Sequence, residues 1–136
     1  MKVLMLNGSC NPKGCTYTAL TEVGKALTSA GIDYEIVQLD GGPVRDCIGC
    51  NQCSKSGCVF TDDGVNDFIA KARQADGFVF GTPVYYAHPS GRVLSFLDRV
   101  FYAGGSAFAG KPGAAVASAR RAGTTASLDA LGKYFG

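Results

Sequence analysis

The chain has 136 residues, of which 46% are hydrophobic and 18% charged, and its formal net charge is +2 at pH 7. The weak, scattered positive charge gives no case for a nucleic-acid-binding protein, and no apolar run approaches the roughly 20 residues of a membrane-spanning helix. The chain enters a strand pattern at once, without a signal peptide, so we expect a single cytoplasmic domain over residues 1–136. Its six cysteines then indicate metal, cluster or redox chemistry more than structural disulfides.

The first predicted element is a strand over residues 2–6, an apolar run too short for an independent helix. A polar, turn-forming loop follows, and a helical pattern begins near Tyr17. Such a junction presents backbone N–H groups and the positive end of the helix dipole to an anion, and Ser9, Thr16 and Thr18 add hydroxyl donors. This loop is a candidate phosphate site, with an ordinary capped helix as the alternative.

Spacing excludes two better-known phosphate loops. Lys13 precedes Gly14, so the loop does not match the P-loop of ATPases, and it contains no G-x-G-x-x-G of dinucleotide-binding domains. A loop that uses hydroxyls and amides, without a dedicated lysine or magnesium, suits a monophosphate such as that of FMN.

The pattern continues as an α/β sheet. An apolar stripe with helical spacing runs over residues 17–30, Gly31 ends it, and residues 33–39 alternate as a second strand. A strand, helix and strand in succession imply a right-handed parallel crossover.

Four cysteines lie in the next loop with the spacing C-x2-C-x2-C-x4-C, at Cys47, Cys50, Cys53 and Cys58. The compact spacing brings three thiolates together, and Cys58 supplies the fourth ligand that a [4Fe–4S] cluster needs. Tetrahedral zinc, a reversible disulfide and a loop without metal are open alternatives.

A helix over residues 65–72 and a short buried strand over residues 77–81 come next. The loop after this strand carries Pro83, Tyr85 and Tyr86. Ligands of open parallel sheets bind outside the carboxyl ends of the strands, so this loop and the Ser9 loop are expected at one edge. The tyrosines suit the wall of a flat aromatic ligand, although they could instead cover the core.

The last predicted elements are a helix over residues 93–101, a strand over residues 112–119 and a helix over residues 127–134. Arg120 and Arg121 follow the strand, where a guanidinium suits bidentate recognition of an oxyanion, with a solvated pair at a loop as the alternative. His88, the single histidine, is read as a structural or exposed residue.

Four segments in the right order carry a resemblance: LNGSCNPKGCTYTAL, CIGCNQC, GTPVYYAHPSGRVLSFLDR and SARRAGTT. Together the chain resembles the NADPH-dependent FMN reductase branch of the flavodoxin-like fold, which includes the iron–sulfur flavoproteins. The resemblance implies a doubly wound parallel sheet with helices on both faces, bound FMN at its carboxyl edge and NAD(P)H as co-substrate.

The resemblance also implies the residues of the site. The FMN contacts would be Ser9, Cys15, Thr16, Thr18, Pro83, Val84, Tyr85, Tyr86, Ser118, Ala119, Arg120 and Gly123. The metal ligands, if a [4Fe–4S] cluster is present, would be Cys47, Cys50, Cys53 and Cys58. No catalytic side chain is assigned, because the flavin itself carries out the redox step.

Two departures from the family pattern affect these expectations. Cys10 stands where many relatives have proline, which removes no evident ligand. The chain also ends before the family's fifth strand and last helix, so we expect a C-terminally short sheet of order 2-1-3-4 whose fourth strand is a bare edge. A bare edge is a template for pairing and predicts a homo-oligomer, or else a destabilised fragment.

The leading functional hypothesis is an FMN-dependent oxidoreductase that passes electrons from NAD(P)H through bound FMN to a second acceptor by a ping-pong mechanism. One alternative is an iron–sulfur flavoprotein electron carrier fed by a protein donor such as ferredoxin. Another is a truncated, non-catalytic domain. The electron donor and acceptor are small molecules or proteins.

Overall fold

The computed structural model describes residues 1–39, 41–53 and 57–136. The elements follow in the order β1 (Lys2–Asn7), α1 (Cys15–Ser29), β2 (Asp33–Gln38), α2 (Val65–Arg73), β3 (Gly77–Tyr85), β4 (His88–Pro89), α3 (Gly91–Gly104), the 3-10 turn η1 (Gly105–Ala107), β5 (Gly113–Ser118) and α4 (Thr124–Gly132). Apart from the short strand β4 and the turn η1, strands and helices alternate, as the sequence pattern predicted.

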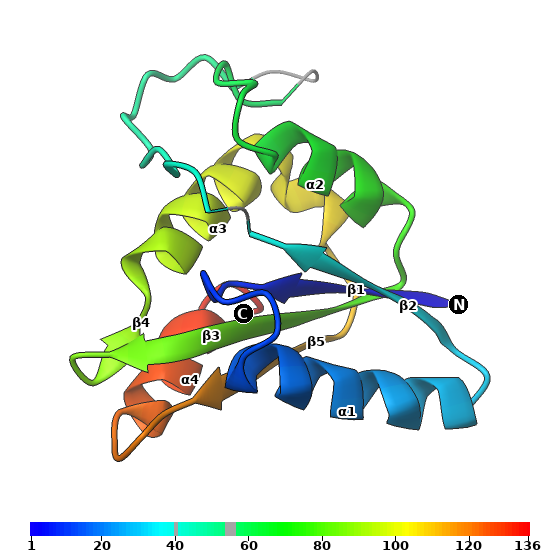
Figure 1. The fold of residues 1–136 in the computed structure, drawn as a ribbon. Coiled ribbons are helices and arrows are strands. Elements are labelled where there is room, and N and C mark those ends of the chain that lie inside the picture. The colour runs from blue at the N-terminus through cyan, green and yellow to red at the C-terminus, as the bar shows by residue number, and fades with distance from the viewer. Residues whose placement is uncertain (40, 54–56) are drawn as a thin grey trace.

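Four of the strands form one parallel sheet in the order β2-β1-β3-β5 (Figure 1). β5 is the fourth strand expected from the sequence, so the predicted order 2-1-3-4 is confirmed. The short strand β4 is antiparallel to the end of β3 and lies outside this path. The carboxyl ends of the parallel strands share one edge, which places the loops that follow them there.

The two central strands, β1 and β3, are buried on both faces because their side chains alternate between two core clusters. In β1, Leu4 and Leu6 belong to one cluster and Met5 to the other, and all three are fully buried. β3 repeats this alternation with Phe80 and Val79. The continuous apolar runs in the sequence are therefore explained by a two-sided sheet.

Helices cover both faces, as predicted. α1 lies on one face, where its Leu20 packs with Met5, and α2 and α3 lie on the opposite face (Figure 1). α4 shares that second face, since its Leu131 joins the cluster that contains Phe68 of α2 and Phe96 of α3. The larger core therefore lies on the side away from α1.

The structure differs from the predicted boundaries at β3. We expected a strand that ends at Gly81 and then a loop, but β3 continues to Tyr85 and turns back into β4. Tyr86 and Ala87 form the two-residue turn with φ of 50° and 65°. Such turns usually carry Asn-Gly or a similar pair, so the sequence had no signal for this hairpin.

The helices α1 and α4 also begin earlier than expected, at Cys15 and Thr124.

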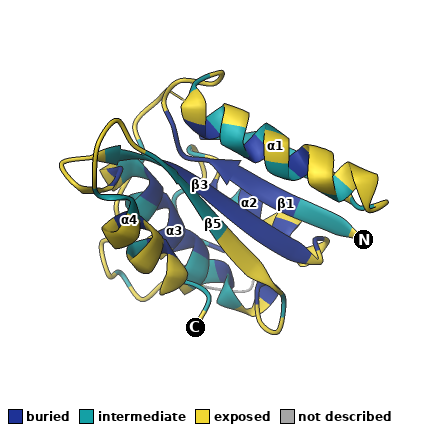
Figure 2. Cartoon of the chain, turned by 90° about the horizontal axis from the view of Figure 1, so that it is seen from below, coloured by how far each residue is buried: buried dark blue, intermediate teal, exposed yellow. Residues whose placement is uncertain are grey.

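β5 is the edge of the parallel sheet: it pairs with β3, and no other described strand pairs with it. Its first residues are exposed and the remainder half-buried (Figure 2).

Within the described residues, no helix is long and apolar enough to cross a membrane.

The end of the chain is tied to α3 by Tyr134, whose hydroxyl donates to the Asp98 carboxylate at 2.5 Å. Burial, and then the hydrogen bond to Asp98, raise the pKa of Tyr134 above its usual range. Because the folded state favours the protonated phenol, this contribution is complete below a pH of about 10 and is lost as the pH rises above it.

We expect Tyr134→Phe to cost about 1 kcal/mol at pH 7, the value of one hydrogen bond, and to reduce the loss of stability above pH 10. Urea midpoints measured from pH 7 to pH 11 test this. Tyr102→Phe is the control, because Tyr102 lies on α3, the helix that carries Asp98, and is largely exposed. Parallel pH profiles for wild type and Tyr134→Phe would contradict the assignment.

Candidate functional site

The carboxyl ends of β3 and β5 and the segments that follow β1 and β5 meet around a cavity of about 400 Å³ at one edge of the sheet. Its lining residues are Ser9, Asn11, Gly14, Cys15, Thr16, Pro83, Ser118, Ala119 and Arg120. All but Asn11 and Gly14 belong to the predicted FMN contacts. The expectation that these loops share one edge is met by the geometry.

The loop after β1 is held in place by the last residues of two strands. Asn7 is fully buried; its Oδ1 accepts from the Ser9 backbone N–H at 3.2 Å, and its Nδ2 donates to Gln38 Oε1 at 2.6 Å. Gln38 Nε2 in turn donates to the Ser9 carbonyl at 2.6 Å. The Ser9 hydroxyl accepts from the Asn11 N–H at 3.1 Å. The loop is thus preorganised by the amide side chains of β1 and β2.

The N-terminus of α1 opens onto this cavity. Its N-cap, Gly14, provides no side-chain cap, its first turn has no acidic residue, and the first intrahelical bond runs from the Thr18 N–H to the Gly14 carbonyl. Buried Thr16 shares a 2.7 Å hydrogen bond with the Ser118 hydroxyl at the end of β5. This arrangement offers N–H and hydroxyl donors to an anion.

The other predicted FMN contacts lie beside the cavity without lining it. The Thr18 hydroxyl donates to the Gly14 carbonyl. Val84, Tyr85 and Tyr86 belong to the β3–β4 hairpin, in which Tyr86 is fully exposed. The Tyr85 hydroxyl lies 3.8 Å from Cys10 Sγ, and Gly123 packs against Ala87 and Val84.

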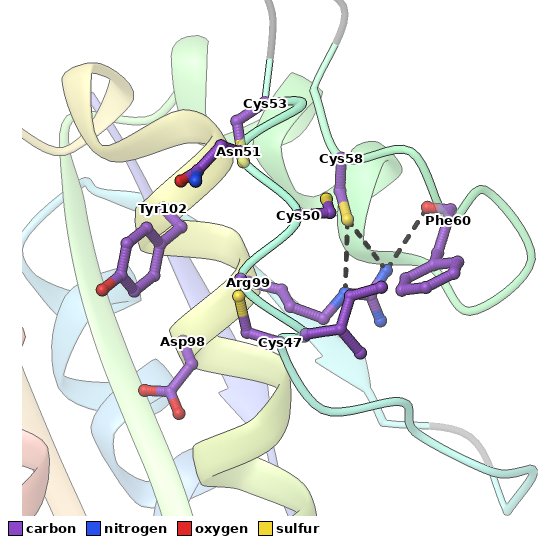
Figure 3. Close-up of a pocket in the computed structure, with 11 residues that line it drawn as sticks. Cys47, Cys50, Asn51, Cys53, Cys58, Phe60, Asp98, Arg99 and Tyr102 are labelled. Carbon is purple, nitrogen blue, oxygen red and sulfur yellow. Dashed lines mark hydrogen bonds between the residues drawn. The ribbon is translucent and has the colours of Figure 1, made fainter.

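A second cavity, of about 360 Å³, lies between α3 and the cysteine segment, the described residues 47–53 and 57–58 that carry the four cysteines (Figure 3). It is lined by Cys47, Ile48, Gly49, Cys50, Asn51, Cys53, Cys58, Phe60, Asp98, Arg99 and Tyr102. The described residues of the segment have almost no regular secondary structure and arch over α3 on the face away from α1 (Figure 1). All four predicted ligands therefore border one space.

The thiol of Cys53 is influenced electrostatically by the other three cysteines. Partial burial raises the pKa of the Cys53 thiol, and the neighbouring groups of Cys58, Cys50 and Cys47 raise it further. No disulfide joins them. Within the described residues, no three His, Cys, Asp or Glu side chains converge as they would on a single metal ion.

A buried ion pair forms one wall of this cavity. Arg99, on the inner face of α3, is 1% exposed and Asp63 is 4% exposed, and Asp63 accepts from both terminal nitrogens of the guanidinium. Arg99 Nε and Nη2 each donate to Cys58 Sγ at 3.3 Å (Figure 3). The same guanidinium lies 5.1 Å from the centre of the Phe60 ring.

Comparison with known proteins decides the family. A profile of NADPH-dependent FMN reductases matches residues 1–136, the whole chain. The protein belongs to that family.

Similar proteins agree with this FMN reductase assignment. The chain is 36% identical over 100 residues to an iron–sulfur flavoprotein of Methanocaldococcus jannaschii, a match that covers 73% of this chain and 51% of the relative. The chain thus spans about half the length of that relative. Among solved structures, RosB with bound 8-demethyl-8-formylriboflavin-5'-phosphate has a TM-score of 0.73 at 15% identity, covering 100% of this chain and 59% of RosB.

An NAD(P)H:quinone oxidoreductase from Methanothermobacter marburgensis has a TM-score of 0.68 at 16% identity, covering 97% of this chain and 72% of that structure. These structural similarities support the flavodoxin-like α/β fold.

The edge cavity fits the phosphate group that the FMN reductase family implies. A helix N-terminus without a side-chain cap, the hydroxyls of Ser9, Thr16 and Ser118, and the cation Arg120 all border it. This is a donor set for a phosphate monoester.

The cysteine cavity fits a cluster better than a single ion. One water molecule takes about 30 Å³ in the liquid, so the cavity has room for a group of several atoms. In a [4Fe–4S] cluster each thiolate binds a different iron, so the ligands need not converge on one point. Cys47, Cys50, Cys53 and Cys58 would hold such a group.

Sequence reasoning missed the residues that support both cavities. Gln38 and Arg99 were not singled out, and no role in either cavity was assigned to Asn7 or Asp63. One signal was available for Arg99: it is a charged residue on the apolar stripe of α3, between Phe96 and Val100. A charge at such a position is rarely buried without a partner.

Proposed function

We propose that the protein is an FMN-dependent oxidoreductase that uses NAD(P)H. The observation that supports this most is that Ser9 and Thr16, from the β1–α1 connection, and Ser118 and Arg120, from the end of β5 and the loop after it, border one cavity at the carboxyl edge of the sheet. Family membership and the flavodoxin-like fold agree with it.

The residues of this chain would bind and orient the cofactor. The α1 N-terminus, with the Thr16 and Ser118 hydroxyls, would hold the phosphate, and the end of β3 from Pro83 to Tyr85 would flank the ring. Bound FMN would supply the redox chemistry, accepting hydride from NAD(P)H and reducing a second acceptor in ping-pong fashion. Arg120 places a permanent positive charge beside the cavity, which would stabilise an anionic ligand.

An absorption spectrum of protein purified without oxygen, with released flavin and iron measured on the same sample, tests this proposal. Flavin bands that bleach on addition of NAD(P)H and recover with an acceptor are the expected result. If the protein keeps its secondary structure but does not bind added FMN, the proposal is wrong and a non-catalytic domain is favoured.

The two adjacent arginines provide a sharper test of the cofactor site. Arg120 borders the cavity and Arg121 does not. We expect Arg120→Ala to weaken FMN binding about tenfold, which corresponds to about 1.4 kcal/mol, and Arg121→Ala to leave it nearly unchanged. Quenching of flavin fluorescence during titration measures both affinities. Equal affinities for the two variants would remove Arg120 from the site.

We also propose a second candidate function, an iron–sulfur flavoprotein electron carrier fed by a protein donor. Two observations favour it: the four thiols border one cavity, and the relative with 36% identity is an iron–sulfur flavoprotein. Stoichiometric iron in the anaerobic sample would support this function. Rapid turnover with NAD(P)H alone would favour the simple reductase.

We further propose that the protein forms a homo-oligomer through the outer edge of β5. This strand has backbone groups with no partner strand among the described elements, and such an edge invites pairing. Sedimentation at increasing concentration measures association, and a monomer at all concentrations would contradict it.

A further inference from the structure

The guanidinium of Arg99 is the most highly coordinated group in the described part of the cysteine cavity. Besides its pair with Asp63, it donates to the carbonyls of Arg45 at 3.2 Å and Phe60 at 3.3 Å, and to Cys58 Sγ from two nitrogens. It therefore joins the backbone on both sides of the four cysteines, at Arg45 and Phe60, to α3 beneath them.

This arrangement does more than stabilise the fold. A buried ion pair is expensive to desolvate and can often be replaced by apolar residues at little cost. Here two of the five N–H donors of Arg99 are directed at a sulfur atom that the ion pair does not require. Among the hydrogen bonds of the described residues, Cys58 is the one cysteine of the four that accepts from a guanidinium.

Hydrogen bonds to cysteine sulfur are among the factors that set the reduction potential of iron–sulfur clusters. A donor to the sulfur offsets the negative charge that a reduced cluster gains, and so makes reduction easier. Groups that orient a ligand from behind also typically raise affinity 10–100-fold. Arg99 is placed to do both for Cys58.

We propose that Arg99 is a positioning residue that holds Cys58 as the fourth ligand of an iron–sulfur cluster and, through its two N–H···S hydrogen bonds, raises that cluster's reduction potential. This inference rests on the proposed iron–sulfur function. Asp63 fixes the guanidinium, and Cys58 is the point at which the protein tunes the cluster.

The test compares Arg99→Lys with Arg45→Lys. Arg45 is a matched control: its guanidinium lies 5.0 Å from the same Phe60 ring, but it is half-exposed and pairs with Asp62. Lysine keeps the charge at either position and removes the planar fork that reaches both Asp63 and Cys58.

After anaerobic reconstitution of each protein, iron and sulfide per chain, the rate of iron loss to a chelator and the midpoint potential by EPR-monitored titration are measured. We expect Arg99→Lys to lose iron about 10–100 times faster than wild type and to have a more negative midpoint. Arg45→Lys should match wild type in both.

If Arg99→Lys does not fold, the double variant Arg99→Gln/Asp63→Asn removes both charges together and leaves no uncompensated charge, and the same shifts are expected. Wild-type protein that binds no iron would overturn the iron–sulfur function and this role with it. Normal iron binding in wild type, with unchanged potential and iron loss in the Arg99 variants, would overturn the role of Arg99 alone.

Discussion

Replacement of Asp63 with alanine is expected to lower the free energy of unfolding by about 3–5 kcal/mol. The side chains of Asp63 and Arg99 are 4% and 1% exposed, so solvent cannot compensate the charge that remains. Loss of the carboxylate leaves a guanidinium buried beneath the cysteine segment without its counter-ion. Urea denaturation should show a lower midpoint with an unchanged slope, since the surface exposed on unfolding is nearly the same.

Asp62 is the matched control for this prediction. It precedes Asp63 in the chain and also pairs with an arginine, Arg45, at 2.8 Å, but both partners are half-exposed or more. We expect Asp62→Ala to leave the urea midpoint nearly unchanged, because exposed ion pairs contribute little. Similar midpoints for Asp62→Ala and Asp63→Ala would show that the buried pair does not anchor the fold.

The second large effect is expected at Gly123, which precedes α4 and packs against the β3–β4 hairpin. Its φ is 94°, and a Cβ there would lie 2.5 Å from Ala87 Cα. The left-handed conformation and the backbone clash together should make Gly123→Ala cost about 3 kcal/mol. Because the hairpin must move away from the end of β5, we also expect FMN to bind at least tenfold more weakly, about 1.4 kcal/mol.

Gly110→Ala separates the two causes. Gly110 has a φ of 71°, also in the left-handed region, but nothing lies within 4 Å of the position of its Cβ. The Gly110→Ala variant should lose only about 1 kcal/mol of its free energy of unfolding, the cost of the left-handed conformation, and should bind FMN normally. Thermal unfolding and flavin titration of both variants give the comparison. Equal losses would mean that the contact with Ala87 has no part in either effect.

The sheet was largely predictable because its signals are local. Residues 2–6 and 77–81 are short apolar runs bounded by turn residues, a pattern typical of buried parallel strands. The β3–β4 hairpin was not predictable, because Tyr86 and Ala87 adopt left-handed conformations that their side chains disfavour. The turn packs against Gly123, which lies in a distant part of the sequence, so no local pattern reveals this contact.

The phosphate-site residues were predictable for a similar reason: a polar loop between a strand and a helix is visible in one stretch of sequence. The residues that hold this loop in place were not predictable. Asn7 and Gln38 are 31 residues apart, and they meet because β1 and β2 pair in a register that places them side by side.

By itself, the sequence determined the fold class, the segments that meet at the edge cavity and the spacing of the four cysteines, because these depend on neighbouring residues or on the periodicity of one element. The order of the parallel strands followed from the resemblance to the FMN reductase family. Only the tertiary structure decided that Arg99 lies under the cysteine segment, paired with Asp63 and bonded to Cys58. The partners are 36 and 41 residues from Arg99, so no local pattern links them, and only the packing of α3 against the segment brings their charges together.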